Sequence, residues 1–155
     1  MLFYTHLAFS ALIGLFLLDY LPFSNKLIFF LFLLLFSSLP DIDRSNSKFG
    51  KKVGFLSKII NFFAGHRNFF HSLLFLVLFY LLISIFSDMI AVAFLIAVSS
   101  HLVLDALTPM GVAFLFPLNY RVKGVLKTGS MAEKALFLIF ITLIIIKLST
   151  GHPLF

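Results

Sequence analysis

Five apolar stretches, separated by short polar segments and two larger loops, account for most of this 155-residue chain. They cover residues 3–18, 26–39, 69–87, 89–107 and 134–149. Hydrophobic residues make up 61% of the sequence, charged residues only 12%, and the mean hydropathy is +1.12. Soluble domains carry charge at about a quarter of their positions. We therefore predict an integral membrane protein, an all-α polytopic bundle with about five transmembrane helices that folds as a single domain over residues 1–155.

The lengths of these stretches bound the topology. A helix needs about 20 residues to cross about 30 Å of hydrocarbon. The third and fourth stretches meet this requirement, whereas the other three are short and require tilt, flanking residues or local thinning of the bilayer. Residues 51–64 carry apolar side chains at helical spacing among lysines, which predicts a short interfacial helix; a loop helix packed on the bundle is the alternative. The first 20 residues lack the features of a cleaved signal peptide, so we expect the chain to retain them.

Lysine and arginine are concentrated in residues 40–68 and 108–133, which a five-span topology puts on the same side of the membrane. The other side has Lys26 and Lys147. The positive-inside rule then predicts that the N-terminus and both basic loops are cytoplasmic. Because topology and contact with anionic lipid account for the net charge of +6, we expect no nucleic-acid partner.

Four of the six acidic residues and four of the five histidines fall into short clusters on this cytoplasmic side. The chain contains no cysteine, so imidazole and carboxylate are the only strong metal ligands available. A mixed set of nitrogen and oxygen ligands favours Zn²⁺, with Mn²⁺ or Fe²⁺ as alternatives, and we expect one to three divalent ions. The candidate metal ligands are His6, Asp41, Asp43, His66, His71, His101, Asp105 and Glu133.

His101 and Asp105 are four residues apart and share one face of a predicted helix. A hydrogen-bonded intramembrane pair is the alternative to a metal site, although a charged residue at the centre of a span costs about 2.5–3.5 kcal/mol and therefore usually has a function. Asp41 and Asp43 follow Pro40 at the end of the second apolar stretch. They can bracket a cation in an irregular segment, or they can serve as turn and cap residues.

His66 and His71 can face one site only if His66 lies in a loop and His71 in the first turn of a helix. Arg67, between them, suits bidentate binding of a phosphate, and a charge that only sets topology is the alternative. Glu133 follows Ser130 in a capping-box pattern, so it is either a ligand or a carboxylate at a helix N-terminus.

The order of these motifs resembles the YdjM family of small bacterial and archaeal membrane-bound metal-dependent hydrolases. The resemblance implies a multi-helix protein of the prokaryotic inner membrane and metal-dependent hydrolysis. It also implies a distant kinship with zinc-dependent phospholipase C and P1 nuclease, which are soluble helical enzymes that cleave phosphoesters. One departure is Asn68-Phe69-Phe70, where a smaller or hydroxylated stretch is expected, and this affects access of the substrate. The matching segments span almost the whole chain and are Thr5-His6, Pro40-Asp41-Ile42-Asp43, His66-Arg67, His71-Ser72, Ser100-His101 through Asp105 to Gly111, Pro117-Leu118, and Gly129 to Glu133.

We therefore predict a hydrolase that cleaves a phosphoester of a lipid or lipid-linked substrate at the cytoplasmic membrane face. Arg67 would anchor the phosphate, and Asp43 and Glu133 are candidates for acid/base catalysis. The main alternative is an ion or metal transporter, which predicts polar residues continuing to the outer face. A metal-free lipid phosphatase would need an arginine near His101 that is missing, and a structural protein leaves the clustering unexplained. The sequence gives no indication of the oligomeric state.

Overall fold

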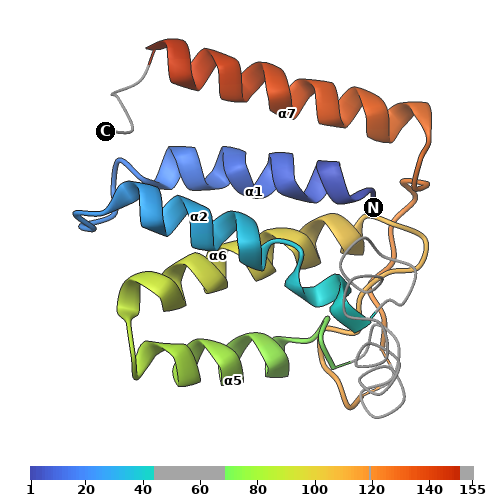
Figure 1. Cartoon of the computed structure of the whole chain (residues 1–155). Coiled ribbons are helices and arrows are strands. Elements are labelled where there is room, and N and C mark those ends of the chain that lie inside the picture. Colours follow the sequence, from blue (N-terminus) through green and yellow to red (C-terminus); the bar gives the residue numbers. More distant parts are fainter. Residues whose placement is uncertain (44–68, 119, 151–155) are drawn as a thin grey trace.

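A computed structural model describes residues 1–43, 69–118 and 120–150, and these form an all-helical bundle. The residues that it describes contain no strand; one isolated bridge joins Val112 and Val122. The helices lie roughly side by side (Figure 1). Their bounds are α1 (Phe3–Leu17), α2 (Lys26–Phe36), a 3₁₀ turn η1 (Leu39–Asp43), α5 (Leu73–Ser84), α6 (Asp88–Ala106) and α7 (Met131–Thr150).

Each predicted apolar stretch corresponds to one of these helices, but the third and fifth helices differ in extent from the prediction. The third stretch forms a helix of only 12 residues, because Ser72 is the N-cap of α5 and accepts a hydrogen bond from the backbone N–H of Phe75. The last stretch is longer than predicted, since α7 has 20 residues and begins directly after Ser130. The predicted interfacial helix at residues 51–64 lies outside the described residues.

By length and composition, α6 alone among the described helices meets the requirements of a membrane span. α7 is as long, but its ends carry Glu133, Lys134 and Lys147. The outer surfaces of the helices are apolar, with large side chains on α5 and α7 such as Leu78, Leu81 and Leu138 more than half exposed. An exterior of this kind is the one expected in lipid. The five-span topology itself stays a prediction.

The packing order explains how distant segments meet. α1 packs against α7, α2 and α6, while α6 also packs against α2 and α5. Figure 1 shows the N-terminus, the end of α2, the start of α5, the end of α6 and the start of α7 at one end of the bundle, which we call the site end. Gly14 allows α1 and α2 to approach closely, since a Cβ there would meet Leu33 at 2.8 Å. Helices that follow one another along the chain alternate in direction, and this brings five chain segments to the same end.

The loop between α6 and α7 closes the site end. Val112 and Val122 exchange two backbone hydrogen bonds, and the backbone N–H groups of Gly111 and Gly124 both donate to the carbonyl of Thr108. Gly111 has a φ of 65°, a conformation that strains other residues. This part of the chain is thus an ordered cover and not a loose connection.

Candidate metal centre

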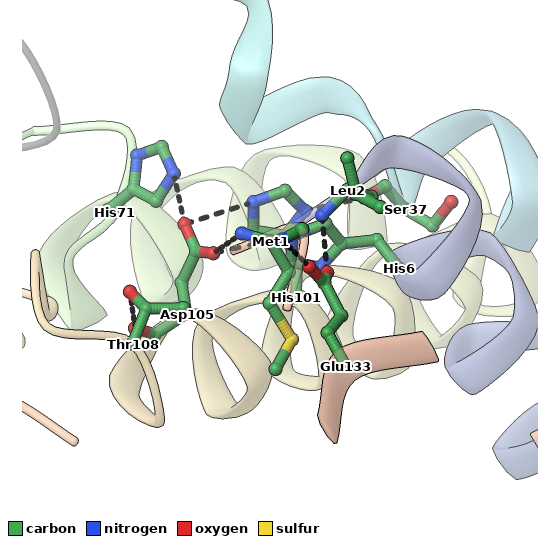
Figure 2. A network of polar contacts seen from close by, with 10 residues as sticks. Met1, Leu2, His6, Ser37, His71, His101, Asp105, Thr108 and Glu133 are labelled. Atoms are coloured by element: carbon green, nitrogen blue, oxygen red, sulfur yellow. Dashed lines mark hydrogen bonds and ion pairs between the residues drawn. The ribbon is translucent and has the colours of Figure 1, made fainter. Parts of the chain in front are cut away.

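Five of the predicted ligands are buried together at the site end, and Figure 2 shows four of them, His6, His71, His101 and Asp105. They come from four separate segments: α1, η1, the residues just before α5, and the last turns of α6. Each side chain is at least 93% buried, although imidazole and carboxylate are costly to remove from water. The five residues, called the cluster below, are His6, Asp41, His71, His101 and Asp105.

Local structure explains how each segment presents its ligand. His101 and Asp105 lie one turn apart on α6, as their spacing predicts. His71 directly precedes the N-cap Ser72, so the start of α5 fixes its position. η1 turns the chain after α2 and carries Asp41 back toward the helices.

Asp105 is the centre of the cluster. Its Oδ1 lies 3.3 Å from Nε2 of His6, and its Oδ2 lies 3.5 Å from Nε2 of His71 and 3.8 Å from Nε2 of His101. The ammonium of Met1 also donates to Oδ1, at 2.7 Å. One carboxylate therefore faces three imidazoles and a cation, which is a strongly polar arrangement for a buried site.

His101 is held in one tautomer. Its Nδ1 lies 2.7 Å from the backbone carbonyl oxygen of Ser37, which can only accept a hydrogen bond, so Nδ1 carries the proton. In the neutral ring, Nε2 then has a lone pair directed into the cluster. Metal-binding histidines commonly donate the second ring N–H to a carbonyl in this way. The ring of His6 stacks on that of His101 with 3.8 Å between centroids and 7° between planes.

The ligand atoms form two overlapping groups. His6, Asp41 and His101 bring one ligand atom each within 4.8 Å of one another, and so do His71, His101 and Asp105. Both groups share Nε2 of His101, because Nδ1 is occupied by Ser37. Within the described residues, Nδ1 of His6 has no hydrogen-bond partner, while Nε2 of His6 and Nε2 of His101 lie 3.3 and 3.8 Å from the carboxylate of Asp105 without a well-formed hydrogen bond. Buried polar atoms normally have such partners, so these nitrogens fit ligands of a cation.

The charge of the cluster also favours a cation. Burial raises the pKa of Asp41, but Coulombic interaction with the imidazoles of His101, His6 and His71 in their protonated forms opposes this and leaves the pKa below the ordinary value of 3.8. A divalent ion would act in the same direction. Asp41 is therefore expected to be an ionised ligand.

Comparison with known proteins identifies the family. The family model described as YdjM inner membrane protein matches residues 1–153, nearly the whole chain. The chain belongs to the YdjM family. This confirms the resemblance seen in the sequence and supports an inner-membrane location.

Individual YdjM relatives match over part of their length. Protein YvsG of Bacillus subtilis (strain 168) is 41% identical over 100 residues, which cover 62% of this chain and 62% of YvsG. The inner membrane protein YdjM of Escherichia coli (strain K12) is 38% identical over 91 residues, or 54% of this chain and 46% of that protein. The match to YdjM of Shigella flexneri has the same extent. The chain thus aligns with less than two thirds of these relatives. No solved structure matches it.

Glu133, a predicted ligand and catalytic residue, is fully buried but belongs to neither group of ligand atoms in this YdjM protein. Its Oε1 accepts from the backbone N–H of Leu2 at 2.6 Å, and its Oε2 accepts from the N–H of Gly129. Ser130 receives the N–H of Glu133, as a capping residue does. The carboxylate lies at the N-termini of both α1 and α7, where helix dipoles favour negative charge. The contacts of Glu133 are therefore those of a carboxylate at a helix N-terminus, the alternative to a metal ligand.

Three other predicted site residues of the YdjM chain are less well defined. His66 and Arg67 lie outside the described residues, as does any contact they make with the cluster. Asp43 is the last residue of η1, but its side chain also lies outside the description. These three assignments stay predictions.

Two polar contacts that support the cluster were not identified from the sequence. The first is the carbonyl of Ser37, since no side-chain pattern signals which backbone oxygen a histidine will meet. The second is a buried hydrogen bond between the hydroxyls of Ser10, one turn after His6, and Ser100, the residue before His101. The sequence could have indicated this link between α1 and α6, because Ser10 is four residues after His6 and Ser100 directly precedes His101.

Proposed function

We propose that this YdjM protein is a metal-dependent hydrolase that cleaves a phosphoester of a lipid or lipid-linked substrate at the cytoplasmic face of the membrane. The observation that carries the proposal is the convergence of the cluster, His6, Asp41, His71, His101 and Asp105, from four chain segments into one buried site. Segments so far apart in sequence have no local reason to bring ionisable side chains together. A shared ion supplies that reason.

The donor set fits a transition metal. Three imidazoles and two carboxylates favour Zn²⁺, with Mn²⁺ or Fe²⁺ as alternatives. Of the two ring nitrogens of His101, only Nε2 is available to an ion, because Nδ1 donates to the carbonyl of Ser37. An ion held by His6, Asp41 and His101 or by His71, His101 and Asp105 would therefore use the same nitrogen of His101. A bound divalent cation would polarise a phosphoryl oxygen and lower the pKa of a water molecule.

The residues of the chain divide the remaining work. Asp41 and Asp105 balance the charge of the cation, and the hydrogen bond from His101 to Ser37 keeps its ring oriented. We assign Arg67 to the phosphate of the substrate and Asp43 to proton transfer, as the sequence predicts. Glu133 holds the starts of α1 and α7 together and so positions His6 on α1.

A five-span topology with the site end in the cytoplasm belongs to the same proposal. The ordered loop at the site end carries Arg121, Lys123 and Lys127, whereas Lys147 at the opposite end forms an ion pair with Asp19. This distribution agrees with the positive-inside rule. Because the chain has no cysteine, Phe86→Cys and Lys127→Cys give clean single labels for the two faces. A membrane-impermeant maleimide should label Lys127→Cys only after cells are opened, and Phe86→Cys before.

The interior of the bundle favours a hydrolase over a transporter. Beyond the cluster, the described part of the core is an apolar group of Leu15, Leu18, Phe29, Leu33, Ala93 and Ala97. Transport pathways are expected to continue as polar residues across the membrane. A site closed by an apolar layer is instead suited to chemistry at one face.

Metal analysis with a matched control tests the metal site. Wild type, Asp105→Asn and Asp88→Asn would be purified in detergent, loaded with Zn²⁺, desalted and analysed by elemental mass spectrometry. Both aspartates lie on α6, but Asp88 is exposed at the opposite end of the helix. We expect wild type and Asp88→Asn to retain equal amounts of zinc and Asp105→Asn to lose most of it.

Hydrolysis is measured on the same samples with bis(p-nitrophenyl) phosphate and with phosphatidylglycerol in mixed micelles. Activity should require the metal and should disappear in Asp105→Asn while Asp88→Asn keeps it. Equal metal content in all three proteins would overturn the metal site. Full zinc binding without cleavage of either compound would refute the phosphoesterase and leave the site standing.

A further inference from the structure

An open apolar groove of about 310 Å³ runs along α1 between α2 and α7. Figure 1 shows α1 with α7 on one side and α2 on the other. The lining is almost entirely apolar, and small side chains of α1 form part of its floor. The residues used below are Tyr4, Ala8 and Ala11 of α1, Leu34 of α2, and Phe137 and Ile141 of α7.

The residues at one end of the groove are close in sequence to residues of the candidate metal centre. Tyr4 is two residues before His6 on α1, and Phe137 is one turn after Glu133 on α7. On the third wall, Leu34 is three residues before Ser37, whose carbonyl holds His101. All three walls of the groove thus lead to segments that build the site.

A basic residue lies at this end of the groove. Lys134 precedes Phe137 by three residues and Ile141 by seven, so it extends the groove-lining face of α7 toward the site end. Its side chain is exposed. A hydrocarbon groove that ends beside an ammonium group is complementary to an amphiphile with an anionic head.

We propose that this groove binds one acyl chain of a phospholipid, with the phosphate beside Lys134. The apolar side chains exposed on both walls, such as Leu31 on α2 and Leu138 on α7, show that lipid hydrocarbon surrounds the groove in a membrane. Ala8 and Ala11 leave the depth that larger residues would fill. The identification of the bound lipid as the substrate rests on the proposed function. Binding of the lipid to the groove is independent of that function.

Photolabelling tests the groove directly. Purified protein in detergent would be exposed to phosphatidylglycerol that carries a diazirine near the end of one acyl chain, and the adducts mapped by mass spectrometry. Adducts should concentrate on the groove faces of α1 and α7. Ala11→Trp fills the groove from its floor on α1 and Ile141→Trp from its wall on α7, and each should lower this labelling roughly tenfold, since each excluded methylene forfeits apolar burial. Leu78→Trp, on the exposed face of α5, should leave it unchanged.

Lys134→Gln addresses the head of the lipid. It should reduce labelling by the phospholipid several-fold but leave labelling by the matching diacylglycerol, which has no phosphate, unchanged. Circular dichroism of every variant checks that it folds. Because two tryptophan variants approach from different helices, misfolding of one leaves the other as the test.

Three outcomes would overturn the proposal. One is uniform labelling of all exposed helix faces that neither tryptophan changes. Another is an equal decrease, in Lys134→Gln, of labelling by the diacylglycerol and of labelling by the phospholipid. The last is a wild-type dimer whose dissociation by Ala11→Trp shows that a second copy fills the groove. Asp105→Asn should be labelled like wild type, so loss of the metal site and loss of the lipid site are separate results.

Discussion

Replacing His101 with asparagine separates the two contacts of this side chain. Nδ1 donates to the carbonyl of Ser37, while Nε2 faces the cluster. The amide nitrogen of asparagine occupies nearly the same position as Nδ1 of histidine, so His101→Asn keeps the donor for Ser37 and removes the ligand atom. His101→Ala removes both.

The magnitudes follow from linkage. At a free zinc concentration 1,000 times its Kd, binding stabilises the fold by about 4.1 kcal/mol. Loss of a residue that only hydrogen-bonds to a metal ligand weakens metal binding up to about 100-fold. Loss of the ligand itself should therefore weaken zinc binding by at least about 100-fold. Zinc then contributes only about 1.4 kcal/mol at the same concentration. At about 2–4 °C per kcal/mol for a chain of this size, zinc should raise the Tm of wild type by roughly 8–16 °C and that of His101→Asn by roughly 3–6 °C.

The metal-free proteins provide the control. In EDTA, His101→Asn should unfold near the wild-type Tm, because the carbonyl of Ser37 keeps a donor. His101→Ala leaves that buried carbonyl unsatisfied, which costs about 1–3 kcal/mol. The assay is thermal unfolding in detergent, followed by circular dichroism at 222 nm with and without zinc. An equal zinc-induced rise in wild type and His101→Asn would refute the assignment of Nε2 as a ligand.

Three further substitutions probe other contacts. Glu133→Gln should retain zinc within twofold of wild type by elemental analysis but lose about 1.5–3 kcal/mol of stability, since a neutral amide has one acceptor oxygen and can serve only one of the two helix starts; loss of zinc instead would make Glu133 a ligand. Asp19→Asn breaks the partly exposed pair with Lys147 and should cost no more than about 1 kcal/mol in thermal unfolding, with zinc content unchanged. Gly111→Ala should destabilise the loop by more than about 1 kcal/mol, because φ is 65° and a Cβ would meet the carbonyl of Val122; hydrogen exchange of Val112 and Val122 that stays as slow as in wild type would contradict this.

The apolar pattern predicted the helices but not all their ends. Hydropathy identifies a stretch that avoids water, and in this chain such stretches also include non-helical residues. Ser72, at the polar end of the third stretch, caps α5 and excludes Phe69 and Phe70 from the helix. The start of α7 was nearer to prediction, because Ser130 and Glu133 form a recognisable capping sequence.

The candidate site was predictable where the spacing itself implies geometry. His101 and Asp105 share a face because a helix repeats about every four residues. The topology brought His6, Asp41 and His71 to the same end, but only the packing of α1 against α6 determines that His6 stacks on His101. Glu133 was not predictable in this way. Its buried carboxylate lies at the same end but accepts hydrogen bonds from backbone N–H groups, and the sequence does not show whether a carboxylate will meet such groups or a metal.

The two shortest helices show how the bundle makes room for a polar site. α2 has 11 residues and α5 has 12, so they extend only about 16–18 Å. Both fall short at the site end, where the chain leaves the helical path and presents Ser37, Asp41 and His71. If either helix continued, its backbone groups would hydrogen-bond within the helix, and these residues would point in other directions. A carbonyl inside a helix is hydrogen-bonded to the backbone of that helix, so the carbonyl of Ser37 can meet His101 only because α2 ends there. The ends of the shortened helices thus supply part of the cluster.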